Sequence, residues 1–231
     1  MEIYDNDENN SRLKEIFSEV GKKYGYDSVN AEFMAFRDFK CRWQRSYGWA
    51  DFRVSDYLDD APDEVLRSLA DSLFKRILGE NDTFSAELRA WVTDPSFCAL
   101  KQDVYISRSP NFTRSPIGES KNLQESYDRL IGAGLVSYDP SIVLTWTKEP
   151  YSHRAGGCSV LMRVVSITSV LDADEVPDFV VDYCLYHQLC HMIIGFDPDS
   201  EAHEEQYNRL ENMFPEKPEA KYWLRKLCAY V

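Results

Sequence analysis

Apolar residues recur at helical spacing in three segments of the chain, each flanked by polar or turn-forming residues. In the first segment, Leu13, Ile16 and Val20 fall on one face of a helix. The second follows Pro62 and begins with acidic residues, which suit the first turn of a helix. The pattern predicts helices over residues 11–25, about 59–78 and 122–136.

Other segments alternate apolar and polar residues and predict strands. Residues 31–58 contain such alternation, interrupted by turn-type residues at 45–49, and predict two strands joined by a turn. A second pair is predicted over 141–150 and 158–168, separated by the turn-rich segment 151–157. The sequence therefore predicts an α+β fold.

Residues 79–120 are the least regular part of the chain, with one helical piece at 84–92 followed by several prolines. We interpret this segment as a connector. It ends an N-terminal α+β region, residues 1–120, and precedes a second domain, residues 121–231. That domain is predicted to contain a helix over 179–194 that stops at Gly195.

The two regions resemble each other in a strand, turn, strand and helix order. Pro62 aligns with Pro177 at the start of the last helix in each. In this alignment Ser72 and Arg76 occupy the places of two histidines of the second copy, so the first copy cannot bind a metal in the same way. The alternatives are a degenerate internal repeat and a chance likeness of two small units.

Composition narrows the function classes. The 231 residues are 44% hydrophobic, enough for a real core, and carry a net charge of -13, which disfavours nucleic acid as a partner. No apolar stretch approaches the roughly 20 residues of a membrane span, and the chain starts with polar and acidic residues. The six cysteines are dispersed without a CxxC pair, as in a reduced protein. We expect a cytoplasmic protein without a membrane anchor.

Histidines carry the candidate chemistry. The chain has four, and three of them lie within residues 187–203. His187 and His191 are four residues apart on the predicted helix, so their Cβ atoms lie about 5–6 Å apart, a distance that one Zn²⁺ can bridge. The alternative is a helix face that carries two imidazoles with no ligand role. After the break at Gly195, His203 on the next helical stretch is the predicted third ligand, which leaves a fourth position for water.

Several neighbours could add to or replace this ligand set. Glu201 is an alternative third ligand, and Cys184 lies on the face of His187 but is more typical of an apolar core position. Cys190 points away from that face. Glu204 and Glu205 are interpreted as solvated helix charge, with a supporting role at the metal as the alternative. His153, in the turn at 151–157, is expected at the surface, with a place at the rim of a cleft as the alternative.

Gln188 decides what such a site could do. In peptidases with a His-Glu-x-x-His motif, the glutamate takes a proton from zinc-bound water. Here the motif reads His187-Gln188-Leu189-Cys190-His191. An amide can orient water but cannot deprotonate it, and loss of a general base typically costs on the order of 10²–10⁴ in rate.

These motifs, with the segments 176–196 and 202–215 around them, resemble the SprT-like and minigluzincin zinc metallopeptidases. The resemblance implies a short sheet over the active-site helix and zinc bound by His187, His191 and His203. Gln188 stands where the family has its catalytic glutamate, through natural inactivation or a deliberate Glu→Gln change. We therefore expect either an impaired peptidase acting on peptide or protein substrates, or a metal-stabilised module that binds a protein partner without catalysis.

Overall fold

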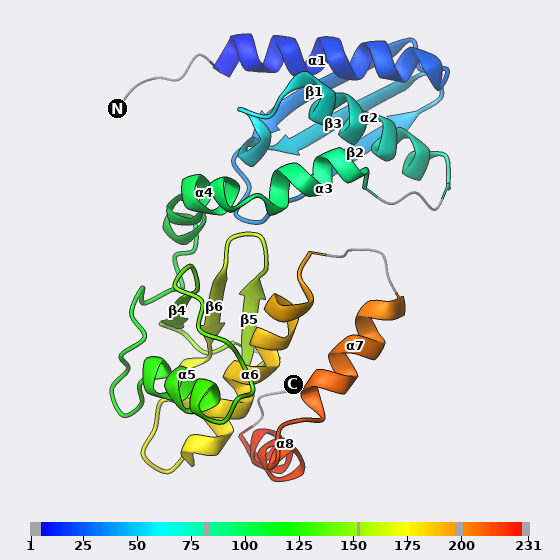
Figure 1. The fold of residues 1–231 in the computed structure, drawn as a ribbon. Coiled ribbons are helices and arrows are strands. Elements are labelled where there is room, and N and C mark those ends of the chain that lie inside the picture. Colours follow the sequence, from blue (N-terminus) through cyan, green and yellow to red (C-terminus); the bar gives the residue numbers. More distant parts are fainter. Residues whose placement is uncertain (1–5, 81–83, 152, 197–200, 228–231) are drawn as a thin grey trace. The chain divides into compact units, whose positions relative to one another are not determined.

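The structure is a computed structural model that describes residues 6–80, 84–151, 153–196 and 201–227. It divides into two compact units, Met1–Phe97 (unit 1) and Cys98–Val231 (unit 2). Each unit contains one three-stranded sheet with helices packed against it (Figure 1). The predicted α+β class is therefore confirmed.

Unit 1 begins with a long helix and a sheet whose first and last strands lie side by side. Strands β1 and β3 are parallel, and β2 pairs with β3 in the antiparallel direction, so the strand order is β1-β3-β2. A short 3-10 turn leads from the sheet into the second helix. The elements are α1 (Asn6–Lys23), β1 (Ser28–Met34), β2 (Cys41–Ser46), β3 (Trp49–Ser55), η1 (Asp56–Leu58), α2 (Asp63–Ile77), α3 (Ala86–Thr93) and the start of α4 (Pro95–Ser107).

The core of unit 1 forms where α1 and α2 pack beside the sheet. Phe52 of β3 is fully buried, and its ring meets Phe17 of α1 and Phe74 of α2 edge-on at 5.0 Å each. Edge-to-face contacts of this kind contribute about 0.5–1.5 kcal/mol beyond the burial of the rings. Phe52 thus ties the sheet to both helices.

Unit 2 has the same arrangement. Strands β4 and β6 are parallel, β5 pairs with β6 in the antiparallel direction, and the order is β4-β6-β5. Helix α6 contacts β5, β6 and the helices α5, α7 and α8, so it is the centre of the unit (Figure 1). The elements are α5 (Leu123–Gly132), β4 (Val143–Trp146), β5 (Gly156–Ser159), β6 (Val164–Ile167), η2 (Ser169–Leu171), α6 (Asp178–Ile194), α7 (Glu201–Glu211) and α8 (Lys217–Lys226).

The two units share more than strand order. Among the described residues, both contain a helix, three strands, a 3-10 turn and two helices in succession. The starts of β1 and β4, β2 and β5, β3 and β6, α2 and α6, and α3 and α7 are each 115 residues apart. Pro62 and Pro177, which align in the sequence, are the N-caps of α2 and α6.

Three predicted segments differ from the structure. Residues 31–58 hold two strands and the end of β1, because the chain leaves the sheet after Met34 before it returns as β2. The predicted strand 158–168 is divided into the end of β5, a turn and β6, and Arg163 in the turn adopts a φ of 51°. Such a turn is hidden in the sequence, because positive φ is usually signalled by glycine. In the predicted connector, α3 agrees with the helical piece expected at 84–92, whereas α4 was not predicted.

The compact division falls at residues 97 and 98, whereas the sequence suggested 120 and 121. The segment between these positions packs on unit 2. Gln102 donates to the carbonyl oxygens of Ser141 and Met162, and Phe112 forms a β-bridge with Thr147. Such contacts are long-range and leave no periodic signal in the segment itself.

Along the parts of the chain that the structure describes, no helix combines the length and apolarity required to cross a membrane.

Candidate metal centre

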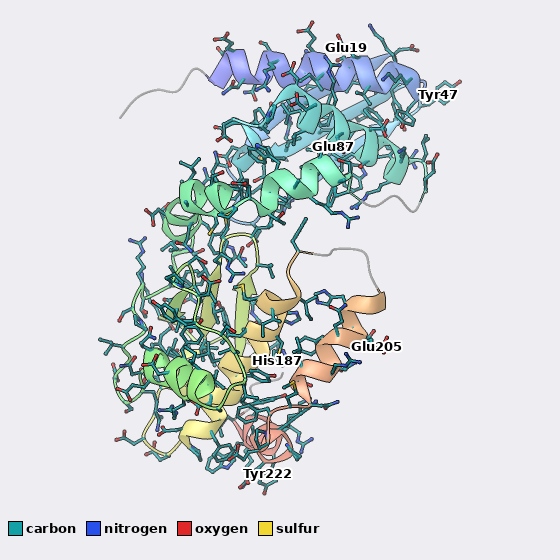
Figure 2. All side chains as sticks on the ribbon, viewed as in Figure 1. Glu19, Tyr47, Glu87, His187, Glu205 and Tyr222 are labelled. Atoms are coloured by element: carbon teal, nitrogen blue, oxygen red, sulfur yellow. The ribbon has the colours of Figure 1, made fainter. Side chains whose placement is uncertain are left out.

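Helix α6 supplies the first two predicted ligands. It begins after Pro177 and ends at Gly195, whose φ of 86° favours glycine and stops the helix. His187 and His191 lie one turn apart on it, with ring centroids 5.9 Å apart. Figure 2 shows His187 on the side of α6 that faces α7. The spacing of four residues therefore brings the two imidazoles together, as predicted.

Helix α7 brings the third histidine to the same place. The ring of His203 stacks on His191 with a centroid distance of 5.7 Å, and the ring of Tyr207 also stacks on His191, at 4.5 Å. His191 Nδ1 and His203 Nε2 are 3.4 Å apart. Two nitrogens bound to one tetrahedral zinc at ~2.0–2.1 Å would lie about 3.3–3.4 Å apart. The separation of this pair suits a shared zinc as well as a hydrogen bond.

The buried carboxylate of Glu211 lies next to the Nδ1 side of the His187 ring. Glu211, at the end of α7, is 3% exposed, and its Oε1 lies 2.7 Å from the Tyr183 hydroxyl and 3.1 Å from His187 Nδ1. Lys217 forms an ion pair with its other oxygen. Burial alone would raise the pKa of Glu211, but hydrogen bonds from Lys217, Tyr183 and His187 lower it to about 2. Glu211 is therefore ionised and can only accept hydrogen bonds.

Glu211 favours one tautomer of His187. A carboxylate cannot donate, so a hydrogen bond between these two groups requires the hydrogen on His187 Nδ1, which leaves the lone pair on Nε2. The Tyr207 hydroxyl lies 2.5 Å from the same Nδ1 and 3.3 Å from Glu211 Oε1, so it can bond to either group. A carboxylate on one ring nitrogen is the arrangement that prepares the other nitrogen for a metal.

Electrostatics keep two of the imidazoles neutral. Burial lowers the pKa of His187, although Glu211 opposes the shift. Burial also lowers the pKa of His191, and the neighbouring His187 and His203 lower it further. Neutral imidazole is the form that binds metals, so both rings are in the ligating state near neutral pH.

The three rings nevertheless do not form a finished three-ligand set. Within the described ranges of the chain, no group of three or more His, Cys, Asp or Glu side chains is placed so that it could hold a metal ion. Only the distance between His191 Nδ1 and His203 Nε2 matches that of two zinc ligands, and His187 lies next to this pair. A three-histidine site requires Nε2 of His187 to join the pair.

Gln188 lies beside a small pocket of about 170 Å³. It is 8% exposed, and the pocket is also lined by His187, Cys184, His153 and Gly156. His153 is exposed, as predicted, and it lies at the rim of this pocket. At the start of β5, a Cβ on Gly156 would lie 3.1 Å from Gln188 Cγ, so any larger residue would crowd this close approach.

The cysteines near the site are poor ligands. Cys184 is 1% exposed within the hydrophobic core, and burial raises the pKa of its thiol, so it stays protonated. Burial likewise raises the pKa of Cys190 to about 12. Of the acidic candidates, Glu204 and Glu205 are exposed, and the side chain of Glu201 lies outside the described residues.

Unit 1 has none of these ligands at the corresponding positions. At the offset of 115 residues, Ser72, Arg76 and Leu88 stand where unit 2 has its three clustered histidines. Serine, arginine and leucine are not zinc ligands. The candidate centre is therefore a property of unit 2.

Reasoning from sequence missed Glu211 as the group that orients His187. A signal was present, because His203, Tyr207 and Glu211 follow one another at intervals of four residues and so share one face of α7. The partner lysine was not predictable, since Lys217 lies on the next helix.

No protein-family model, curated protein or solved structure significantly matches this chain.

Proposed function

We propose that unit 2 is a zinc-binding unit of the metallopeptidase type, with His187, His191 and His203 as ligands. The observation that carries the proposal is the 3.4 Å separation of His191 Nδ1 and His203 Nε2, which suits two ligands of one tetrahedral zinc. The hydrogen bond from His187 Nδ1 to Glu211 supports it, because the remaining nitrogen is then a ready ligand.

Hydrolysis would depend on the residue beside the first ligand. Zinc bound here would supply an acidic water and polarise a peptide carbonyl. Gln188 can hold that water by a hydrogen bond but cannot accept its proton, so peptide hydrolysis by this chain should be slow or absent. The proposed substrates of an active form are peptides or proteins, held next to β5 at the pocket rim.

A second candidate is a metal-stabilised module that binds a protein partner without catalysis. Gln188 favours it directly, because the general base is missing while the three histidines and Glu211 are present. In this case zinc would contribute folding free energy rather than chemistry.

We also propose that unit 1 is a degenerate copy of unit 2. The shared element order and the offset of 115 residues between the starts of five pairs of elements support an internal duplication. The described cysteines, Cys41, Cys98, Cys158, Cys184 and Cys190, are all free, which supports a reducing, cytoplasmic location.

Metal content tests the zinc proposal. We expect purified chain to retain about one zinc per molecule by elemental analysis, and X-ray absorption to show nitrogen ligands at ~2.0–2.1 Å. His203→Ala should lower the retained zinc strongly, whereas the matched substitution His153→Ala should leave it unchanged. A chain that binds no zinc, or a His203→Ala variant with full zinc, would contradict the proposal.

A further inference from the structure

The edge of the sheet in unit 1 is open to solvent along strand β2. This strand pairs with β3 on one side, and no other described strand pairs with its outer side. All of its residues from Arg42 to Ser46 are exposed. An open edge presents unpaired backbone N–H and C=O groups that can bind a further strand.

Large apolar side chains are exposed on β2, on the turn that follows it and on the neighbouring strands β1 and β3. Of the described residues of unit 1, the exposed large hydrophobic ones are Leu78 and a group at the sheet. That group consists of Met34, Trp43, Tyr47 and Trp49. Tyr47 projects fully into solvent from the turn between β2 and β3 (Figure 2). Clustered exposed aromatics of this kind mark interaction surfaces.

The same strand is basic in a strongly acidic chain. Residues 40–50 contain Lys40, Arg42 and Arg45 and no acidic residue, although the whole chain has 39 acidic and 26 basic residues. On the neighbouring strand, Arg53 is held by Glu32 at 2.8 Å and by Asp51 at 3.2 Å. The positive charge of this edge therefore comes from β2 and the residue before it, and it complements an acidic partner.

A hollow accompanies the strand. It has a volume of about 600 Å³ and is lined by the apolar Met34, Cys41 and Trp43 and by the polar Arg42, Gln44, Asp51 and Arg53. This volume is within the range of sites that bind small ligands or peptide side chains. Side chains of an added strand that alternate toward this side would find both apolar and polar contacts there.

Three other roles of this surface each explain only part of its residues. They are protection of the edge against aggregation, self-association and nucleic-acid binding. Charges on edge strands protect against aggregation, which accounts for Arg42 and Arg45 but not for the exposed tryptophans. A second copy paired through β2 would set arginines against arginines, which is unfavourable. Single-stranded nucleic acid stacks on aromatic side chains, but the net charge of -13 opposes its approach. Its binding would also leave the open backbone edge unexplained.

We propose that the β2 edge of unit 1 binds an extended acidic peptide segment as an additional strand. The backbone of β2 supplies the pairing, Arg42 and Arg45 select acidic side chains, and Trp43 supplies apolar contact. This binding is independent of the zinc proposed for unit 2.

A binding assay on the full chain tests the proposal, with EDTA present so that the result does not depend on metal. The probe is a fluorescent peptide in which Glu alternates with Val and Thr, followed by fluorescence anisotropy. Joint Arg42→Glu and Arg45→Glu substitutions should weaken binding by about tenfold or more. The control pair Arg209→Glu and Arg225→Glu changes the net charge equally at exposed positions of unit 2 and should have little effect.

Four further arms separate strand pairing from simple charge attraction. A peptide N-methylated at alternate residues should lose binding, and Trp43→Ala should weaken it, while circular dichroism confirms that each variant is folded. Equal binding of the N-methylated peptide, or of a peptide with Lys in place of Glu, would overturn the proposal. It would also be overturned if an oligothymidylate bound this edge and the acidic peptide did not.

Discussion

Units 1 and 2 have the same order of elements and the same strand order, yet they differ in the residues on equivalent surfaces. In unit 2 the helix after the sheet carries His187 and His191, and α7 adds His203. In unit 1 the equivalent helix carries Ser72 and Arg76. The scaffold therefore does not need the histidines to form, because unit 1 has the same element order without them.

The two edge strands also differ, and here unit 1 has the more charged and aromatic residues. In unit 2, β5 is short and uncharged, with the sequence Gly-Gly-Cys-Ser, and it borders the histidine pocket through Gly156. In unit 1, β2 is longer, basic and aromatic, and residues 1–97 contain no histidine. One unit thus carries the candidate chemistry, and the other carries the larger candidate recognition surface.

Restoring a general base at position 188 of unit 2 should produce the largest effect, an increase in the rate of peptide hydrolysis. With zinc bound, Gln188→Glu should raise the rate of peptide hydrolysis by about 10²–10⁴, because a carboxylate can take the proton of a zinc-bound water. Casein and quenched fluorescent peptides provide the measurement. Adding His203→Ala to the Gln188→Glu variant should abolish the gain. If the single variant stays inactive while it binds zinc, the non-catalytic binding module is the better interpretation.

A core substitution in unit 1 tests whether the units are energetically separate. Phe52→Ala removes the ring that contacts Phe17 and Phe74, and should lower the free energy of unfolding of unit 1 by about 3–5 kcal/mol. Hydrogen exchange measured by mass spectrometry should show faster exchange in unit 1, residues 6–80 and 84–97, and not in unit 2. The exposed substitution Ser46→Ala serves as the control. Equal loss of protection in unit 2 would show that the two units unfold as one.

Removing the charge of Glu211 should destabilise unit 2 and has no counterpart in unit 1, where Ser96 occupies the matching position. The native pKa of about 2 lies below the ordinary value of 4.5. This stabilisation, on the order of 3 kcal/mol, is therefore fully present above pH 4.5 and is lost as the pH falls toward 2.

Zinc-free protein allows a direct measurement of this effect. Urea unfolding in EDTA should show Glu211→Gln less stable than the parent chain by roughly 1–3 kcal/mol at pH 7, with a difference that shrinks between pH 4.5 and 2. Lys121→Gln, which removes the more exposed ion pair with Asp178, should have a smaller effect. A difference for Glu211→Gln that does not change with pH would contradict an origin in the charge of this carboxylate.

Local signals account for the elements that were predictable from the sequence. Pro62 and Pro177 mark helix starts and Gly195 marks a helix end, and each acts through its own backbone. The fourfold spacing of His187 and His191 brought two rings together for the same reason, because helix geometry is local. Element order was therefore largely predictable.

Long-range relations were not predictable in the same way. The parallel pairing of β1 with β3 joins strands separated by β2, and no periodicity within either strand announces it. The hidden turn at Arg163 and the buried Glu211 cluster likewise depend on distant partners. The histidines that the structure brings together were predictable from the sequence, but their geometry depends on how α7 packs on α6.

The smallest effect is expected at the first residues of the two edge strands, where substitution should change the free energy of unfolding only slightly. Cys41 and Gly156 begin β2 and β5 at equivalent positions, but only the glycine faces a crowded site. A Cβ at position 156 would lie 3.1 Å from both Gln188 Cγ and the Ser166 carbonyl oxygen, and that oxygen belongs to the backbone of β6 and cannot easily move. Gly156→Ala should therefore lower the free energy of unfolding of unit 2 by about 1 kcal/mol, as modest overpacking does.

Cys41→Ala is the control, because it only shortens a side chain at the strand end. It should change the free energy of unfolding of unit 1 by less, and both effects can be measured by urea unfolding. If Gly156→Ala were neutral, β5 would have room to move away from α6, and the close approach at Gln188 would not restrict the pocket.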